Sequence, residues 1–315
     1  MIRQLIVVGD GRVGLSIAAD LGAAADLRVT VVGRSPERPP FLRDEPDVAY
    51  LADGLPAESS VRALHERLGR ASHDGGGRQR PEGHGPVLVF CVADDQLAEV
   101  SGTWQAAARI RPAAALHTSG VHSAEALAGW SELGVPVAAW HPLVAVAAPR
   151  RGAFAGVWFG TDGEVAAVRI GEELARRLGG RAHAVRPEAR AHYHAAGVFA
   201  SNYLVACLRI ALEELRQASD EADLAALLPL AESAIRNLKA LGLPEGATGP
   251  VVRGDVRTVL THLAVLDPGR ATVYRGLGEE LLALAGNRLD PEVRARLAEA
   301  LSDPSTGTDG QETVR

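Results

Sequence analysis

Three glycines that directly follow a short apolar run near the start of the chain constrain its fold more than any other feature. Residues 5–8 are Leu-Ile-Val-Val, and Gly9, Gly11 and Gly14 follow in the pattern Gly-x-Gly-x-x-Gly. The segment after them has apolar side chains at helical spacing, and residues 27–32 are again strand-like. A strand, a turn, a helix and a second strand thus fit into about 30 residues, the repeating unit of parallel sheets with crossover helices.

The glycine turn also predicts a dinucleotide-binding site. Gly9 permits the tight turn, Gly11 lets the backbone approach a pyrophosphate, and Gly14 lets the helix pack against the strand. The N–H groups and partial positive charge at a helix N-terminus attract phosphate. The flanking elements disfavour the alternative, a turn that is merely rich in glycine. We therefore predict that the cofactor is bound by the turn residues Gly9, Gly11, Arg12, Val13 and Gly14.

The end of the second strand indicates which dinucleotide is bound. Sites for NAD usually place Asp or Glu there to accept a hydrogen bond from the ribose 2′-hydroxyl, whereas this chain has Gly33-Arg34-Ser35, followed by Arg38. An arginine and a hydroxyl suit a 2′-phosphate, and no carboxylate follows the strand to repel it. We predict NADP (NADPH) as the cofactor, bound through Arg34 and Ser35. The alternative to a 2′-phosphate site is that Arg34 is an ordinary loop arginine exposed to solvent.

Strand-like and helical runs alternate along the first part of the chain. Further strands are expected at 87–92, 113–116, 135–140, 157–159 and 182–185, with helices at 57–68, 95–110, 124–133 and 164–178. This alternation predicts an α/β fold with a doubly wound, parallel Rossmann sheet. Because ligands bind at the carboxyl ends of such strands, we expect Val92 and Ala93 to border the cofactor. Asp95 either shares that border or caps the next helix.

The pattern changes after Arg186-Pro187. From residue 188 to about residue 300 we expect helices and no strand, and the Asp-Pro steps fit helix starts with proline at the first position. We predict a Rossmann NADP-binding domain over residues 1–186, an all-helical substrate and dimerisation domain over 187–302, and a flexible tail over 303–315. The glycine-rich stretch 70–86 lacks core residues and is expected to be a mobile loop.

Composition argues against several classes of protein. The formal charge of −6 and the pI near 5.9 disfavour a nucleic-acid partner and a membrane surface, both of which favour a cationic face. No apolar run approaches the roughly 18–20 residues that span a bilayer, and no export signal precedes the first strand. The two cysteines, Cys91 and Cys207, are expected to be free thiols, and the scattered histidines disfavour a metal site. These features predict a soluble, cytoplasmic protein.

Polar clusters stand where this fold binds ligands. His117-Thr118-Ser119-Gly120 and His141-Pro142-Leu143 lie at the carboxyl ends of two predicted strands. The first helix of the second domain places His194, Ser201 and Asn202 on one face. Polar residues on an apolar helix face are also found as satisfied core groups, so both interpretations stay open for His194 and Asn202.

A fourth cluster lies late in the chain, at Gly249-Pro250-Val251-Val252-Arg253-Gly254-Asp255. Asp255 is a natural N-cap for the helix that follows. Arg253 therefore stands beside a helix N-terminus, a suitable place to bind a carboxylate.

The order of these motifs resembles that of Rossmann-like proteins with a C-terminal DUF2520 domain. The resemblance extends from Ile2 to about Leu284 and includes two further specific segments, Tyr193 to Leu204 and Gly249 to Asp255. Such proteins look like members of the 6-phosphogluconate-dehydrogenase-like superfamily, in which a helical dimerising domain follows the Rossmann domain. The resemblance implies an NADP-linked oxidoreductase and a homodimer, and it includes proteins that stand in for ketopantoate reductase in pantothenate synthesis.

Two related groups of enzymes imply roles for individual residues. His141-Pro142-Leu143 is similar to the His-Pro-Met segment of prephenate dehydrogenases, in which that histidine contacts the group being oxidised. Asn202 matches the substrate-orienting asparagine of β-hydroxyacid dehydrogenases, which carry a lysine one turn earlier where this chain has Val198. The resemblance therefore implies that His194 or His141 replaces that lysine as the general acid.

Together these observations predict an NADPH-dependent reductase of a small 2-oxo acid, with ketopantoate (2-dehydropantoate), reduced to pantoate, as the first choice. We predict that His141, His194 and Asn202 are catalytic and that Ser119, Ser201 and Arg253 bind the substrate. The alternatives are another NADP-linked dehydrogenase, an imine reductase, an F420-linked reductase, and a redox sensor that binds NADPH without catalysis.

Overall fold

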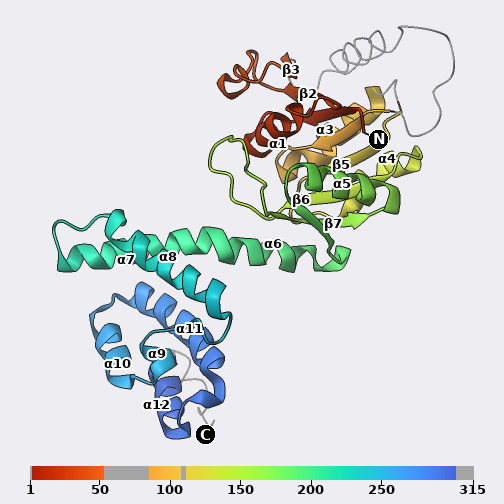
Figure 1. Ribbon diagram of the computed structural model, residues 1–315. Coiled ribbons are helices and arrows are strands. Elements are labelled where there is room, and N and C mark those ends of the chain that lie inside the picture. Colours follow the sequence, from red (N-terminus) through yellow and green to blue (C-terminus); the bar gives the residue numbers. More distant parts are fainter. Residues whose placement is uncertain (1, 53–84, 108–110, 303–315) are drawn as a thin grey trace, which may run out of the picture. The chain divides into compact units, whose positions relative to one another are not determined.

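The structure is a computed structural model, and it describes residues 2–52, 85–107 and 111–302 (Figure 1). The chain divides into two compact units, Met1–Asn202 and Tyr203–Arg315. The helix expected at 57–68, most of the loop expected at 70–86 and the tail expected at 303–315 lie outside the described residues.

The first unit is built on one eight-stranded sheet with the strand order β3-β2-β1-β4-β5-β6-β7-β8. The strands are β1 Gln4–Val8, β2 Arg28–Gly33, β3 Val48–Ala52, β4 Val87–Phe90, β5 Ala114–His117, β6 Val137–Pro142, β7 Trp158–Gly163 and β8 Arg181–Ala184. Neighbouring strands are parallel except for β6 and β7, which are antiparallel. The predicted doubly wound Rossmann fold is confirmed, with this one antiparallel pair added.

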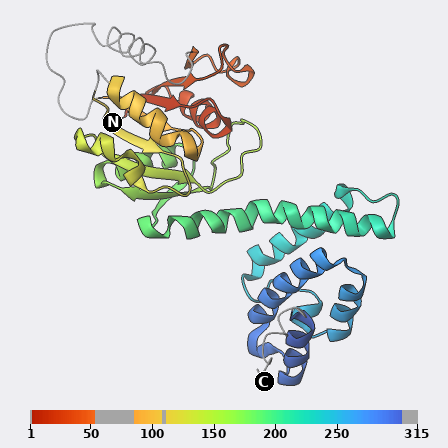
Figure 2. The same cartoon turned by 180° about the vertical axis from the view of Figure 1, so that it is seen from behind.

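Helices cover both faces of the sheet, because successive side chains of each strand point to opposite sides. Leu5 and Val7 of β1 belong to one apolar core with α1 (Arg12–Gly22) and α5 (Val165–Arg177). Ile6 and Val8 belong to a second core with α3 (Leu97–Ala107) and α4 (Ala128–Glu132). Figure 2 shows the sheet and its helices from behind. Short 3₁₀ turns complete the unit at η1 Pro40–Leu42, η2 Asp94–Gln96, η3 Ala124–Leu127 and η4 Pro187–Ala189.

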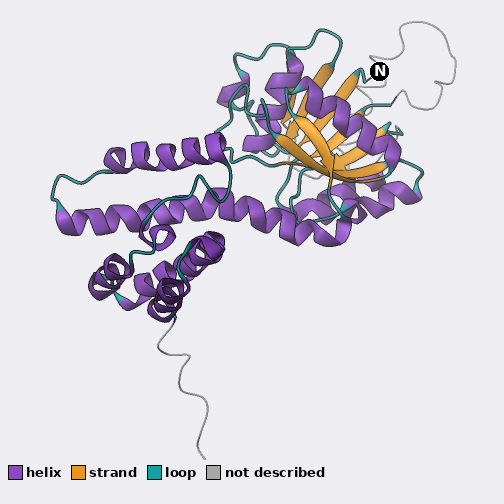
Figure 3. Ribbon diagram, turned by 60° about the horizontal axis from the view of Figure 1, so that its bottom comes forward, coloured by secondary structure: helices purple, strands orange, loops and turns teal. Residues whose placement is uncertain are grey.

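All regular structure described in the second unit is helical (Figure 3). Its elements are α7 Leu204–Ala218, α8 Leu224–Leu241, α9 Pro250–Arg253, α10 Val256–Val265, α11 Pro268–Ala285, η6 Gly286–Arg288 and α12 Pro291–Leu301. The Asp-Pro steps begin helices as predicted: Asp267 and Asp290 are N-caps whose carboxylates accept backbone hydrogen bonds, and proline follows each. Asp255 caps α10 in the same way, through Thr258 N–H. The all-helical character of this part is confirmed.

The boundary between the two units lies later in the sequence than residue 187, where it was predicted. Helix α6 (Arg190–Val198) and the π turn η5 (Phe199–Tyr203) follow that point, yet the compact units divide between Asn202 and Tyr203. The physical reason is that Arg190 and Tyr193 of α6 bond to β6 and β7 and so hold this helix on the first unit.

One helical stretch runs against the expectation that no apolar run is long enough for a bilayer. Pro187–Ala218 is 32 residues long, and its most apolar window has a mean hydropathy of 1.6 with none of the window buried. By length and composition it could cross a membrane. The sequence prediction counted uninterrupted apolar residues, whereas an average over a window tolerates polar ones such as Asn202. A single helix of this kind is weak evidence, so this stretch does not define a membrane protein.

Candidate functional site

The glycine turn has the geometry that a bound pyrophosphate requires. Gly9 has φ +119°, and a Cβ there would lie 2.3 Å from the carbonyl oxygen of Cys91. Gly11 is the N-cap of α1, and as a glycine it has no side chain that could accept a hydrogen bond from the first turn. A Cβ on Gly11 would meet nothing within 4 Å. A Cβ on Gly14 would lie 2.4 Å from Gly9 O, so only glycine lets the helix pack this closely. The helix N-terminus is therefore open toward solvent and presents N–H groups without a side-chain acceptor.

The carboxylate of Asp10, a residue of the glycine turn, lies at the end of β2. Asp10 Oδ2 accepts hydrogen bonds from Ser35 N–H and Tyr50 O–H, each at 3.0 Å. Burial alone would raise the pKa of Asp10, but the hydrogen bonds from Ser35 and Tyr50 outweigh it and lower that pKa. The same burial and the Asp10 charge raise the pKa of Tyr50 to about 12. Sequence reasoning considered only the residues that follow β2 and missed this group.

The two arginines beyond β2 differ in their surroundings. Arg34 is exposed at the strand end, where a 2′-phosphate would lie. Arg38 instead donates to the carbonyl oxygens of Leu42 and Glu45, at 2.7–3.0 Å, and so closes its own loop. The prediction of NADP therefore depends on Arg34 and Ser35 alone.

The end of β4 lies against the glycine turn. A Cβ on Gly9 would come within 3.3 Å of Val92 Cγ1, so Val92 borders the turn as expected. Ala93 is exposed and is the N-cap of η2, with Asp94 and Asp95 in the first turn. Asp95 is thus not the N-cap that the sequence suggested as one alternative.

The loop after β5 is held by its own buried polar groups. His117 is fully buried; its Nδ1 accepts from Ser119 N–H at 3.2 Å and its Nε2 lies 2.9 Å from Ser123 O. Burial lowers the pKa of His117 to about 4, so the ring is neutral. Ser119 is also buried, and its Oγ accepts from His122 N–H at 3.1 Å. These contacts set the position of Gly120, which follows.

Two imidazoles from different elements converge on Gly120. A Cβ on Gly120 would lie 2.2 Å from His194 Nδ1 and 2.9 Å from His141 Nε2. His141 lies on β6 and His194 on α6, and the two rings meet edge to face with their centroids 5.7 Å apart. Burial lowers the pKa of His141 to about 4, with the neighbouring His194 and Arg190 acting in the same direction. His141 is therefore a neutral imidazole at physiological pH.

A pocket of about 640 Å³ in the first unit gathers most of the predicted residues. Arg12 of the glycine turn lines it together with His141, His194, Ser201 and Asn202. Apolar residues 143–147 and 197–198 supply much of the remaining wall. Ser119 is not among the lining residues, and Arg253 belongs to the second unit, where it is exposed at the end of α9. The predictions for Ser119 and Arg253 thus remain sequence predictions.

The π turn places Ser201 and Asn202 on this pocket. Residues 199–203 form a π-helical turn between α6 and α7, a feature that occurs often at functional sites. Ser201 Oγ donates to Gly197 O at 2.7 Å and lies 3.0 Å from Asn202 Oδ1. No sequence signal marks this turn, because its composition does not differ from that of an α-helix.

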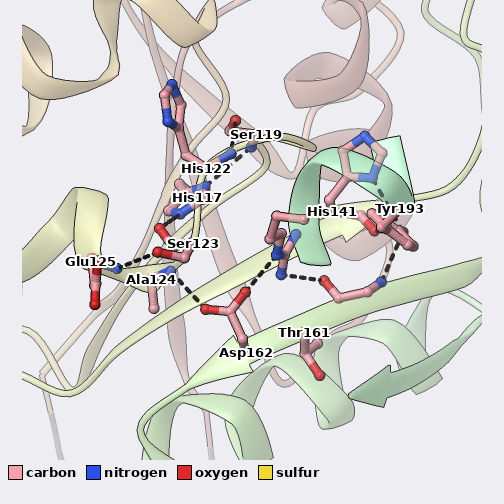
Figure 4. A network of polar contacts seen from close by, with 12 residues as sticks. His117, Ser119, His122, Ser123, Ala124, Glu125, His141, Thr161, Asp162 and Tyr193 are labelled. Carbon is pink, nitrogen blue, oxygen red and sulfur yellow. Dashed lines mark hydrogen bonds and ion pairs between the residues drawn. The ribbon is translucent and has the colours of Figure 1, made fainter. Parts of the chain in front are cut away.

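A buried ion pair supports the wall behind His141 (Figure 4). Arg190 Nε donates to Asp162 Oδ2 at 2.5 Å, and Nη2 donates to Gly160 O at 3.1 Å. Asp162 Oδ1 accepts from Ala124 N–H at 2.7 Å. Both charged side chains are at most 4% exposed. This network joins β7, α6 and the start of η3, and sequence reasoning did not find it.

Among the residues that the structure describes, no cluster of three or more His, Cys, Asp or Glu side chains is arranged to hold a metal ion.

Comparison with known families identifies one domain. Residues 157–281, from β7 to within α11, match the family described as "Domain of unknown function (DUF2520)". The match, which covers less than half of the chain, agrees with the resemblance to DUF2520 proteins that the motifs predicted. No curated protein matches the chain.

Solved structures share the fold over almost the full chain. A protein assigned as an NADP oxidoreductase, BF3122 from Bacteroides fragilis, matches with a TM-score of 0.66 and 19% identity, covering 89% of this chain and 98% of its own. Protein TM1727 from Thermotoga maritima matches with a TM-score of 0.61 and 20% identity over 90% and 99% of the two chains. A pyrroline-5-carboxylate reductase from Coxiella burnetii matches with a TM-score of 0.52 and 15% identity over 94% and 95%. At these identities the similarity establishes a shared Rossmann-type fold.

Proposed function

We propose that this chain is an NADP(H)-linked oxidoreductase that interconverts a small 2-oxo acid and the corresponding 2-hydroxy acid. The observation that carries the proposal is that Arg12, a residue of the glycine turn and the first of α1, lines the same pocket as His141 and His194. A residue of the predicted dinucleotide turn and a pair of imidazoles thus line one cavity. The similar structures described as an NADP oxidoreductase and as a pyrroline-5-carboxylate reductase support the reaction class.

The residues at the glycine turn fit a dinucleotide. The open N-terminus of α1 at Gly11 would hold the pyrophosphate, and Arg34 with Ser35 would hold the 2′-phosphate. NADP(H), when bound, supplies or accepts the hydride, so the chain itself has to orient the carbonyl, bind the carboxylate and move one proton.

The pocket residues divide these tasks. Arg12, which the sequence assigned to the cofactor, brings a positive charge to the pocket and suits the substrate carboxylate, the role that the sequence assigned to Arg253. Asn202 and Ser201 present amide and hydroxyl groups that orient a polar substrate. His141 Nε2 and His194 Nδ1 face the same small space beside Gly120 and are the candidates for the proton transfer. Ketopantoate is the 2-oxo acid we would test first.

The state of His141 determines how pH affects each direction. Because its pKa is about 4, the neutral ring accepts a proton from a substrate hydroxyl at any pH well above 4. Oxidation of the hydroxy acid should therefore lose rate as the pH falls toward 4, whereas reduction, which needs the protonated ring, should gain rate over the same interval. Opposite slopes for the two directions below pH 6 are expected in initial-rate measurements.

The test is an NADPH absorbance assay against a panel of 2-oxo acids that includes ketopantoate. His141→Ala and His194→Ala should be compared with His192→Ala, an exposed histidine of the same helix that is absent from the pocket lining. Loss of the proton-transfer group should lower kcat by about 10²–10⁴-fold, while the other imidazole should mainly affect KM. Tight NADPH binding without cofactor oxidation across the panel would overturn the proposal in favour of a redox sensor.

A further inference from the structure

The hydroxyl of Tyr193 lies within hydrogen-bonding distance of three groups. Its Oη is 3.1 Å from Gly160 N, 3.1 Å from the backbone carbonyl oxygen of His141 and 3.3 Å from His141 Nδ1 (Figure 4). His141 and Gly160 are directly opposed in the β6–β7 ladder, so Tyr193 bonds to both strands at one register position.

Counting protons assigns the direction of each bond. A tyrosine hydroxyl has one proton to donate and two lone pairs to accept with. Gly160 N–H can only donate and the carbonyl oxygen can only accept, so the hydroxyl proton points to His141 O and one lone pair faces Gly160 N–H. The second lone pair is left for Nδ1, which must then carry a proton.

We propose that Tyr193 is a positioning residue that holds His141 with its proton on Nδ1 and the lone pair of Nε2 directed at the space beside Gly120 and His194. This inference rests on the proposed function for its catalytic meaning, but the tautomer is a property of the protein alone. In the opposite tautomer the hydroxyl would have to turn toward Nδ1, and the carbonyl oxygen of His141 would lose this donor.

The surroundings of Tyr193 keep its hydroxyl in place. A Cβ on Gly160 would lie 2.6 Å from Tyr193 Cζ, so glycine at this strand position makes room for the ring. The Arg190 guanidinium lies 5.7 Å from the centre of the Tyr193 ring and is itself held by Asp162. Burial raises the pKa of Tyr193, which keeps the hydroxyl protonated and able to donate to the carbonyl oxygen.

The tautomer determines what His141 can do. With the lone pair on Nε2, the ring can accept the hydroxyl proton of a 2-hydroxy acid, while NADP⁺, when bound, would supply the acceptor for the hydride. The O–H and C–H bonds break, an N–H bond forms on the ring and the carbon–oxygen bond becomes a carbonyl. The imidazolium that forms keeps its Nδ1–H bond to Tyr193. Reduction runs through the same groups in reverse.

Nitrogen NMR of ¹⁵N-histidine-labelled protein tests the tautomer without substrate or cofactor. We expect His141, assigned by loss of its signals in His141→Gln, to show a protonated Nδ1 and an unprotonated Nε2. In Tyr193→Phe the Nδ1–H loses its acceptor, and the signals should shift toward the other tautomer. The matched control is Tyr274→Phe, because Tyr274 Oη lies 2.9 Å from His262 Nδ1 in the second unit; that variant should move only the His262 signals. An unprotonated Nδ1 of His141 in the unmodified protein, or signals unchanged in a folded Tyr193→Phe, would overturn the inference.

Kinetics separate this inference from the proposed function. If a substrate is found, Tyr193→Phe should lower kcat by about 10–100-fold with KM nearly unchanged, the usual effect of losing a group that orients a functional histidine. The expected tautomer with no activity toward any 2-oxo acid would support the role of Tyr193 while contradicting the proposed function. Activity toward a 2-oxo acid together with the opposite tautomer would support the proposed function and contradict the role of Tyr193.

Discussion

The two units of the chain differ in how much of their apolar surface they bury. The first unit has an extensive core on each face of its sheet, and Trp104, Trp130 and Trp140 are almost completely buried. The second unit has one small core, made of Val251, Val256, Val259, Leu282, Leu297 and Leu301. Of its three longest helices, α7 and α8 contain no buried residue, and only α11 contributes to the core. The first unit therefore supplies its own core, whereas the second leaves apolar helix faces uncovered.

Uncovered apolar faces of this extent indicate a partner surface. Helices α7, α8, α10 and α11 all carry large exposed apolar side chains, among them Val205, Leu230, Val265 and Leu277. A pocket of about 670 Å³ with a mostly apolar lining lies among α7, α8, α10 and α11. We propose that a second copy of this chain covers these faces, as the resemblance implies and as is commonest for soluble oligomers.

The largest expected effect belongs to the first unit and tests its self-sufficiency. Arg190→Met leaves the Asp162 carboxylate buried without its cation and should lower the free energy of unfolding by about 3–5 kcal/mol. All four tryptophans lie in this unit, so tryptophan fluorescence during urea unfolding reports on it alone. The control is Arg176→Met, whose ion pair with Glu173 is exposed and should contribute less than about 1 kcal/mol. Equal shifts of the two variants would contradict the prediction.

A smaller effect on the same unit concerns the cofactor. Arg34→Asp should weaken NADPH binding by about ten- to a hundredfold, or roughly 1.5–3 kcal/mol, because a charge-assisted bond is replaced by repulsion. Arg28→Asp, at the other end of the same strand, should leave the affinity unchanged. Titration calorimetry with NADPH and NADH checks both variants. Equal affinity of the unmodified protein for the two dinucleotides would sink the assignment of NADP.

The smallest expected effect belongs to the second unit. Val265→Glu, at a valine that is 75% exposed on the apolar pocket, should weaken self-association by roughly tenfold. Val165→Glu is the matched control, since Val165 is 68% exposed in the first unit and should leave association unchanged. Light scattering at micromolar concentration should give a dimer for the control and a concentration-dependent lower mass for Val265→Glu. If the unmodified protein is a monomer, self-association does not explain the exposed apolar faces of the second unit, and the proposal of a dimer is wrong.

The parts of the fold that were predictable depend on contacts near in sequence. The glycine turn, the crossover helices and the Asp-Pro helix starts each follow from neighbouring residues, and they were predicted. Strand β3 and the direction of β7 were not, because hydrophobic periodicity does not carry strand direction. The boundary between the units was placed too early because Pro187 marks a local change of pattern, whereas α6 is held by distant strands.

The residues of the site also divide into those that local sequence motifs reveal and those that only distant contacts explain. His141, His194, Ser201 and Asn202 stand in recognisable motifs, and the structure gathers them at one pocket. Asp10 reaches the end of β2 through Tyr50 of β3, a strand 40 residues away. Asp162 and Arg190 are charged residues that a sequence would assign to the surface, and only their mutual bond explains their burial.

The π turn at residues 199–203 makes the positions of Ser201 and Asn202 depend on how many residues the turn contains, and not only on which residues they are. An α-helix advances by about 100° per residue, so deleting Ala200 would restore α geometry and swing Ser201 and Asn202 around the axis relative to His194. Such a deletion would keep His141, His194, Ser201 and Asn202 and would change the overall composition by one alanine. A library of single substitutions would therefore miss this determinant. Insertions or deletions at the turn offer a route by which homologous chains diverge in specificity while they keep every polar side chain of the pocket.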